Sequence, residues 1–309
     1  MINRILIRIK VVQMVYSYLL TEKERTIEDA KNELNKSLDK AYELYNGIFV
    51  LLCDLTRLQD LRIDAARNKY LPTEADLNPS TRFIDNELIK TLHKNEDLQE
   101  YLKENPITWQ DDDIFLRLML DKILNSDIYK QYIDAETTDF KTDCEFWRNI
   151  LKKIILVDED FAELLESKSV YWNDDLCSTS TFVLKTLKRI EDGAANQLLP
   201  MYKNDEDKMF GENLFLLTLR NKKYYNELID KFVQTESWDS ERIAFMDRVI
   251  MIVGIAEIIN FESIPTTVTL NEYIEITKYY STMKSSQFVN GILNSIINYL
   301  KDEGKLLKN

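Results

Sequence analysis

Residues 261–301 have the sequence FESIPTTVTLNEYIEITKYYSTMKSSQFVNGILNSIINYLK, which predicts two helices joined by a polar turn. Pro265 interrupts the apolar segment before them, because proline removes a backbone donor from a helix. Thr269 and Glu272 have the spacing of a capping box, in which each side chain bonds the other residue's backbone N–H. The pattern therefore predicts that the first helix begins at Leu270.

The second helix of this stretch follows a break at residues 281–282. Ser285 or Ser286 is its predicted N-cap, since a hydroxyl there accepts a hydrogen bond from a free backbone N–H group of the first turn. Its apolar residues recur at every fourth position, at Phe288, Ile292, Ile296 and Leu300. This spacing is typical of a helix with one buried face.

Gly291 is unfavourable in the middle of the second predicted helix, where a glycine costs about 1 kcal/mol relative to alanine. A glycine is useful where another backbone or a ligand must come close. Two explanations therefore stay open at this position. The commoner one is close packing against another helix, and the other is contact with a ligand.

The stretch combines the pattern IPxxVxxNExIxxxK, a short polar turn and the pattern SxxFVNGxL. This combination resembles the C-terminal part of the NusB family of bacterial transcription antitermination factors. Many positions at fixed spacing carry the resemblance, and it is more specific than a single short motif. The matching residues are Ile264, Pro265, Val268, Asn271, Glu272, Ile274, Lys278, Ser285, Phe288, Val289, Asn290, Gly291 and Leu293.

Two further segments extend the resemblance. Residues 247–258 resemble the helix that precedes the proline motif in the family, and residues 4–18 resemble its first helix through Val12, Gln13 and Tyr16. The matching segments cover about a third of the chain, at its two ends. Family members are much shorter, so the resemblance implies a NusB-like core built from both ends, with a large insertion between them.

The composition predicts an all-α protein. The chain has 309 residues, of which 45% are hydrophobic and 30% are charged, but only 6 glycines and 5 prolines. A β-rich chain of this length would need more turn residues. We expect NusB-like helices in residues 1–66, an acidic helical insertion in residues 67–205, and a NusB-like helical bundle in residues 206–309. Residues 26–66 predict two helices or one bent helix, and residues 83–103 give a further helical pattern.

The charge is unevenly distributed. The formal net charge is −13, which argues against a general nucleic-acid binder. Residues 105–213 contain 23 acidic and 13 basic side chains, so most of the excess lies in the middle. Residues 1–21 and 276–301 each contain three basic residues and no acidic one. The two ends that resemble an RNA-binding family are therefore locally basic.

Several classes of protein are disfavoured. There is no Gly-rich phosphate loop, no nucleophile elbow and only one histidine, His93, so we expect no enzyme and no cofactor. Three widely spaced cysteines give neither a disulfide framework nor a metal knuckle. The acids of residues 111–113 are expected to cap a helix, since acids favour its first turn. No apolar run suits a membrane span, and we expect a cytoplasmic protein.

The resemblance implies a function as well as a fold. Family members bind the boxA element of ribosomal RNA leader transcripts as a heterodimer with a small ribosomal-subunit protein, NusE. That complex joins NusA, NusG and RNA polymerase and suppresses premature termination. The chain is thus expected to be an RNA-binding antitermination factor.

The family's contact positions map onto named residues of this chain. RNA-binding positions of the family correspond to Arg4, Arg8, Tyr16, Tyr280, Lys284, Gln287 and Phe288, which we expect to form one face. Lys284 departs from the family, where an acidic residue is common, and this change should favour phosphate. Phe288 has an alternative as a core residue, because it begins the apolar stripe. Asp247 corresponds to a carboxylate at the NusE interface, with an exposed acid of no special role as the alternative.

Other functions stay open. The net charge and the acidic insertion are compatible with a protein-interaction scaffold that keeps the fold without binding RNA. A detached relative of the NusB-like domain of ribosomal RNA methyltransferases is a third possibility. The segment 67–82 contains Arg67, Lys69, Tyr70 and Arg82 and is predicted to be a loop. Such a basic segment with an aromatic residue can contact RNA, although a solvated loop is the commoner case.

Overall fold

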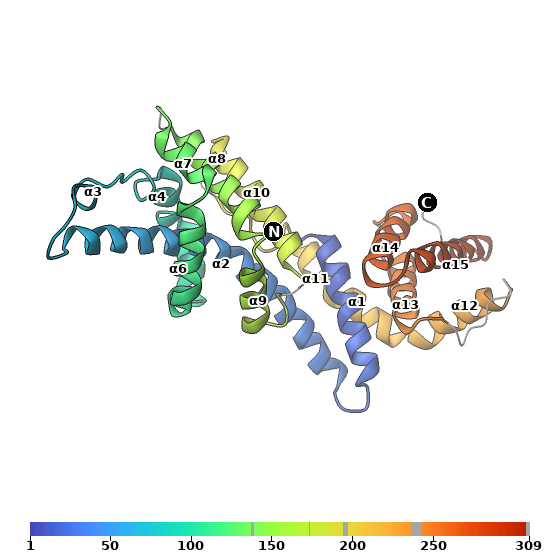
Figure 1. The fold of residues 1–309 in the computed structure, drawn as a ribbon. Coiled ribbons are helices and arrows are strands. Elements are labelled where there is room, and N and C mark those ends of the chain that lie inside the picture. Colours follow the sequence, from blue (N-terminus) through green and yellow to red (C-terminus); the bar gives the residue numbers. More distant parts are fainter. Residues whose placement is uncertain (137–138, 173, 194–196, 236–242, 307–309) are drawn as a thin grey trace. The chain divides into compact units, whose positions relative to one another are not determined.

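A computed structural model describes residues 1–136, 139–172, 174–193, 197–235 and 243–306. Every regular element in these ranges is helical and none is a strand, which confirms the predicted all-α class (Figure 1). The chain divides into two compact units. Unit 1 contains Met1 and residues 39–201, and unit 2 contains residues 2–38 and 202–306 of the described chain. The boundaries expected at residues 66–67 and 205–206 stay a prediction.

Unit 2 combines the N-terminal helix with the C-terminal helices. Its helices are α1 (Arg4–Leu20), the first part of α2 (Ile27–Arg67), α11 (Asp205–Arg220), α12 (Lys222–Thr235), α13 (Phe245–Asn260), α14 (Thr266–Tyr280) and α15 (Met283–Asp302). The apolar helix α13 is at the centre, because it contacts α1, α11, α12, α14 and α15. Its residues from Val249 to Ile258 are all buried. Each surrounding helix therefore buries its apolar face against the same core.

Gly254 of α13 allows α14 to approach closely. A Cβ atom at this position would lie 3.3 Å from Cγ of Tyr273, which is tighter than most such contacts. Gly291 of α15 is different, since apart from its own stretch of helix no described atom would lie within 4 Å of a Cβ there. The expectation of close helix packing at Gly291 is therefore wrong, and the close contact belongs to Gly254.

The start of α14 also differs from the prediction. The helix begins at Thr266, one turn before Leu270, and Pro265 is its N-cap residue. Proline suits a helix start because the missing N–H would be unsatisfied there in any case. The hydroxyl of Thr269 caps no helix, and instead donates a hydrogen bond of 2.8 Å to Glu257. The capping box expected from the spacing is thus absent.

Unit 1 contains the middle of the chain. Its helices are the rest of α2, then α3 (Glu74–Leu77), α4 (Glu87–His93), α5 (Glu96–Glu104), α6 (Asp113–Leu124), α7 (Asp127–Asp134), α8 (Phe140–Ile150), α9 (Glu159–Lys168) and α10 (Leu176–Glu191). A short 3₁₀ turn, η1 (Gln110–Asp112), precedes α6, and a π-helical turn, η2 (Leu151–Ile155), follows α8. Helix α2 is a single helix. The pattern at residues 83–103 forms two, because Asn95 caps α5.

Two features are absent from the described residues. No helix among them is both long enough and apolar enough to cross a membrane. Their His, Cys, Asp and Glu side chains nowhere gather in a group of three that could hold a metal ion.

Candidate functional site

The junction between α14 and α15 is a tight turn held by hydroxyl groups. Thr282 is the N-cap of α15, and its Oγ1 accepts a hydrogen bond of 3.1 Å from the backbone N–H of Ser285. The Oγ of Ser281 donates to the Oγ of Ser285 at 3.0 Å. The predicted cap at Ser285 or Ser286 is therefore wrong by one turn. These bonds fix the direction in which α15 leaves Tyr280.

Three of the predicted RNA-binding residues lie on one face of α15. Lys284, Gln287 and Phe288 are three and four residues apart, a spacing that places side chains on the same side of a helix. Gly291 lies seven residues after Lys284 and continues that side. We call these four residues the outer face of α15. Lys284 and Gln287 are exposed and Phe288 is half-buried, so Phe288 is not a fully buried core residue.

Lys284 is an unengaged cation on this face. It makes no ion pair with any residue that the structure describes. No acidic residue occurs between residues 276 and 301. An exposed lysine in such surroundings keeps its charge available for an anion such as phosphate.

Tyr280 connects this region to α1. Its hydroxyl accepts a hydrogen bond of 3.1 Å from Nε2 of Gln13. Tyr280 is half-buried, whereas its neighbour Tyr279 is 81% exposed. The ring of Tyr280 is thus held in place at the end of α14, next to the turn that leads to Lys284.

Arg8 is not on an exposed face. Its side chain is only 3% exposed, and it forms a bidentate pair with Glu257 in which both N···O distances are 2.8 Å. Glu272 lies 3.9 Å from the same guanidinium. Burial lowers the pKa of Arg8, but the hydrogen bonds and charge of Glu257 outweigh this effect, so the net pKa is raised. Arg8 therefore holds the core of unit 2 together.

Glu257 is the centre of a buried network that the sequence analysis missed. Besides Arg8, its carboxylate accepts hydrogen bonds from the hydroxyls of Thr269 at 2.8 Å and Tyr273 at 3.0 Å. Its side chain is fully buried. A sequence signal for this network exists, because Glu257 is the single charged residue of the apolar run 249–259. A buried carboxylate requires a cation or several donors.

Arg4 is also engaged in ion pairs. Its guanidinium lies 2.8 Å from Glu206 and 2.7 Å from Asp207, and it lies over the ring of Phe210 at 5.2 Å. Burial lowers the pKa of Arg4, and its bonds to Asp207 and Glu206 raise it by more. Arg4 is nine residues before Gln13, which places the two on opposite sides of α1. The structure therefore does not place Arg4 and Tyr280 on one face.

The remaining predicted residues lie near the start of α13. The Tyr16 ring packs against that of Phe245, with centroids 5.1 Å apart. Asp247 is 4% exposed, so the alternative of an exposed acid is wrong. Its Oδ1 atom has no hydrogen-bond partner among the described residues. A buried carboxylate oxygen without a partner is costly and is expected to seek a donor.

The basic segment 67–82 is largely engaged within unit 1. Lys69 lies 2.8 Å from Asp76, and Arg82 donates to the carbonyl of Ala135 at 2.6 Å. Thr73 and Asp76 form a capping box that starts the short helix α3. Tyr70 is 97% exposed. The loop prediction is correct apart from α3, and a contact with RNA stays untested.

Comparison with known proteins matches the C-terminal part of the chain, which contains α13, α14 and most of α15 but neither α1 nor the segment 67–82. The model of the NusB family matches residues 179–298. The chain is 37% identical to the transcription antitermination protein NusB of Salinibacter ruber over 134 residues, which are 41% of this chain and 82% of that protein. The chain belongs to the NusB family.

Other NusB proteins give the same result. The protein of Methylacidiphilum infernorum is 38% identical over 117 residues, covering 37% of this chain and 78% of the relative. The NusB protein of Chloroherpeton thalassium is 45% identical over 73 residues, which are 24% of this chain and 35% of that protein. No solved structure matches the chain. Because NusB proteins are antitermination factors, membership of the family confirms that the chain is not an enzyme.

Proposed function

We propose that this NusB family chain is an RNA-binding antitermination factor that acts in the cytoplasm on boxA-containing ribosomal RNA transcripts, together with the ribosomal protein NusE. The observation that carries the proposal is the outer face of α15. It combines an unengaged lysine, an exposed amide and a half-buried aromatic ring, next to the fixed ring of Tyr280. Cations and aromatic rings side by side are what single-stranded RNA requires.

Each residue of this region has a defined role in the proposal. Lys284 binds a phosphate, and Tyr280 and Phe288 stack on bases, each worth about 1–3 kcal/mol. Gln287 donates to or accepts from a base edge. Gly291 leaves the space beside these residues open, so that the nucleic acid backbone can come close to the helix.

The residues of α1 have supporting roles. Arg8 positions α1 against α13 and α14 through Glu257, and a direct RNA contact would require this buried pair to break. Arg4 is a quarter exposed and can reach a phosphate only in competition with Glu206 and Asp207. Tyr16 supports the start of α13 through Phe245.

Asp247 is the proposed contact for NusE. A donor from the partner would satisfy the Oδ1 atom that has no partner among the described residues, and to reach this buried atom it would have to displace the side chains that cover it. Assembly with NusA, NusG and RNA polymerase would follow from the RNA–NusE complex, as the family resemblance implies.

The experiment that tests this function measures RNA affinity. Fluorescence anisotropy of a labelled boxA RNA is followed as the full chain is added, with and without NusE, and a scrambled RNA of equal composition is the control. We expect NusE to raise the chain's affinity for boxA RNA, and this fold-increase should be at least ten times the fold-increase for the scrambled RNA. Equal affinity for both RNAs, or no saturable binding in either condition, would exclude the proposal.

A second candidate function is a protein-interaction scaffold that does not bind RNA. The ion pairs of Arg4 and Arg8 favour it, because both arginines are already occupied. Under this alternative the chain binds labelled NusE in an anisotropy assay, and added boxA RNA does not change its affinity for NusE.

A further inference from the structure

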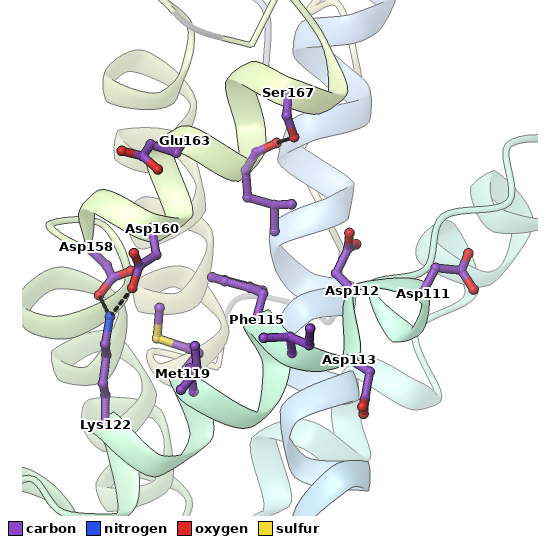
Figure 2. A pocket seen from close by; sticks show the side chains of 13 residues that line it. Asp111, Asp112, Asp113, Phe115, Met119, Lys122, Asp158, Asp160, Glu163 and Ser167 are labelled. Carbon is purple, nitrogen blue, oxygen red and sulfur yellow. Dashed lines mark hydrogen bonds and ion pairs between the residues drawn. The ribbon is translucent and has the colours of Figure 1, made fainter.

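Unit 1 contains a groove that the family comparison does not explain. Helices α6 and α9 line it, together with η1 and residue Asp158, and its volume is about 520 Å³. It lies outside the elements that carry the proposed RNA contacts, so the two sites can be tested separately. Figure 2 shows Phe115 and Met119 between the two helices, with carboxylates around them.

Phe115, which lines the groove, belongs to an aromatic cluster whose other rings lie behind it. The rings of Phe115 and Phe161 are stacked with centroids 5.7 Å apart, and Trp109 lies 5.9 Å from Phe161. Trp109 and Phe161 are buried, and the indole of Trp109 donates a hydrogen bond of 2.8 Å to the carbonyl of Gly47. The buried ring of Phe161 therefore supports Phe115 in its place, and a supported side chain loses less freedom on binding.

Two aliphatic side chains stand exposed at the groove. Ile114 and Leu118 both line it, are 76% and 51% exposed, and lie one turn apart on α6. With Phe115 and Leu164 they form an apolar strip of the kind that a partner helix covers with side chains at positions i and i+4.

The rim of the groove is acidic. The charged residues that line it are Asp111, Asp112, Asp113, Asp158, Asp160, Glu163 and Lys122. Lys168 and Arg117 pair with Asp112 and Asp113 from beside the groove, and the rim is still net negative. Nζ of Lys122 forms ion pairs with the carboxylates of Asp158 at 2.6 Å and Asp160 at 2.7 Å. Asp111 and Glu163 are exposed and make no ion pair within the described part of the chain.

We propose that this groove binds a basic amphipathic segment of a protein partner. Apolar side chains of the segment pack on Ile114, Phe115 and Leu118, and its Lys or Arg side chains pair with Asp111 and Glu163. RNA is disfavoured as the occupant because the carboxylates repel phosphates at short range. A second copy is disfavoured because the chain carries a net charge of −13. An apolar strip with one sign of charge around it selects a partner of the opposite sign.

The probe for this proposal is a synthetic amphipathic peptide of about 18 residues, with leucines at helical spacing on one side and lysines on the other. A scrambled peptide of the same composition keeps the charge and loses the apolar stripe. Binding of each labelled peptide to the full chain is measured by anisotropy at about 0.15 M salt, where long-range attraction is screened. We expect saturable binding of the amphipathic peptide that is at least tenfold tighter than that of the scrambled one.

Matched variants locate the binding. The double substitution Ile114→Ser with Leu118→Ser should lower the affinity for the amphipathic peptide at least tenfold. Leu61→Ser with Leu77→Ser is its control, because both leucines belong to unit 1, are also 51% exposed and do not line the groove. All four side chains are exposed, so the fold should survive. Circular dichroism and an unfolding curve check this.

The charge of the rim is tested in the same way. Asp111→Asn with Glu163→Gln should lower the affinity for the amphipathic peptide about three- to tenfold. The control, Glu100→Gln with Glu104→Gln on α5, should change this affinity less than twofold. Equal losses in the groove and control variants, equal affinity for the two peptides, or no binding would overturn the proposal. A loss of RNA affinity in the Ile114→Ser and Leu118→Ser variant would assign the groove to RNA and overturn it as well.

Discussion

Arg8 and Glu257 form a buried bidentate ion pair that joins α1 to α13. Nε of Arg8 donates to Oε2 of Glu257 and Nη2 donates to Oε1, both at 2.8 Å. The two residues are 249 positions apart in the chain. The pair therefore fastens the N-terminal helix to the C-terminal helices within unit 2.

Removal of the charge at Glu257 should destabilise unit 2. Glu257→Gln leaves the buried guanidinium of Arg8 without its counter-charge, and breaking a buried pair in this way costs about 3–5 kcal/mol. Urea unfolding followed by circular dichroism measures the loss. Glu262→Gln is the control, because Glu262 is exposed, and should change the free energy of unfolding by less than about 0.5 kcal/mol. Equal effects of the two substitutions would mean that the pair does not stabilise the unit.

Tyr273 should make stability fall at alkaline pH. Burial, followed by the charge of Glu257, raises its pKa well above the ordinary value of 10.0. The stabilisation linked to a raised pKa is complete below the unfolded value and is lost as the pH rises above it. Tyr273→Phe should therefore reduce the slope of the free energy of unfolding above pH 10 by up to about 1.4 kcal/mol per pH unit.

The same substitution should also act at neutral pH. Tyr273→Phe removes a hydrogen bond to a charged group and should cost about 1.5–3 kcal/mol. Urea unfolding at a series of pH values measures both effects. An unchanged alkaline slope in the Phe variant would show that Tyr273 is not the titrating group.

Substitution of Gly291 should change stability and RNA affinity in opposite directions. Gly291→Ala introduces a Cβ atom into open space in a helix, so it should stabilise the fold by about 0.5–1 kcal/mol. The added methyl group lies on the outer face of α15 and should weaken boxA binding at least threefold. Thermal unfolding and anisotropy test the two parts. A variant that is more stable and binds boxA RNA as well as the parent would remove Gly291 from the RNA site.

Much of this fold follows from the sequence. The all-α class, the two C-terminal helices and the break at residues 281–282 are predicted from composition and periodicity, since local spacing records which face of a helix is buried. The start of α14 is not predicted, because Thr269 fits a capping box equally well. The hydroxyl of Thr269 instead donates a hydrogen bond to the buried carboxylate of Glu257. That contact depends on where Glu257 lies in space, which local spacing does not record.

The candidate site is predicted less completely. The resemblance to the family places Arg4 and Arg8 among the expected RNA contacts. Their acidic partners, Glu206, Asp207 and Glu257, are about 200 or more positions away, and sequence spacing does not record pairing at such separations. Lys284, Gln287 and Phe288 are placed on one face correctly because that relation is local.

Asp247 should matter for the protein partner and not for RNA alone. Asp247→Asn keeps the size of the side chain, removes its charge and should weaken NusE binding at least threefold, while boxA affinity of the isolated chain stays within twofold. Asp302→Asn is the matched control at an exposed position of α15. Isothermal titration with purified NusE measures the affinity. Parent-like affinity in the Asp247→Asn variant would place the partner contact elsewhere.

The central claim, that the α14–α15 junction binds boxA RNA, is tested most directly by the double variant Tyr280→Ala with Lys284→Glu. We measure its boxA affinity by anisotropy in the presence of NusE, alongside the control Tyr224→Ala with Lys301→Glu, which makes the same substitutions at exposed positions of unit 2 outside the junction. Loss of one phosphate contact should also reduce the salt slope by about 0.7. The account predicts at least a tenfold loss in the junction variant and less than a twofold change in the control; a junction variant within twofold of the parent would contradict it.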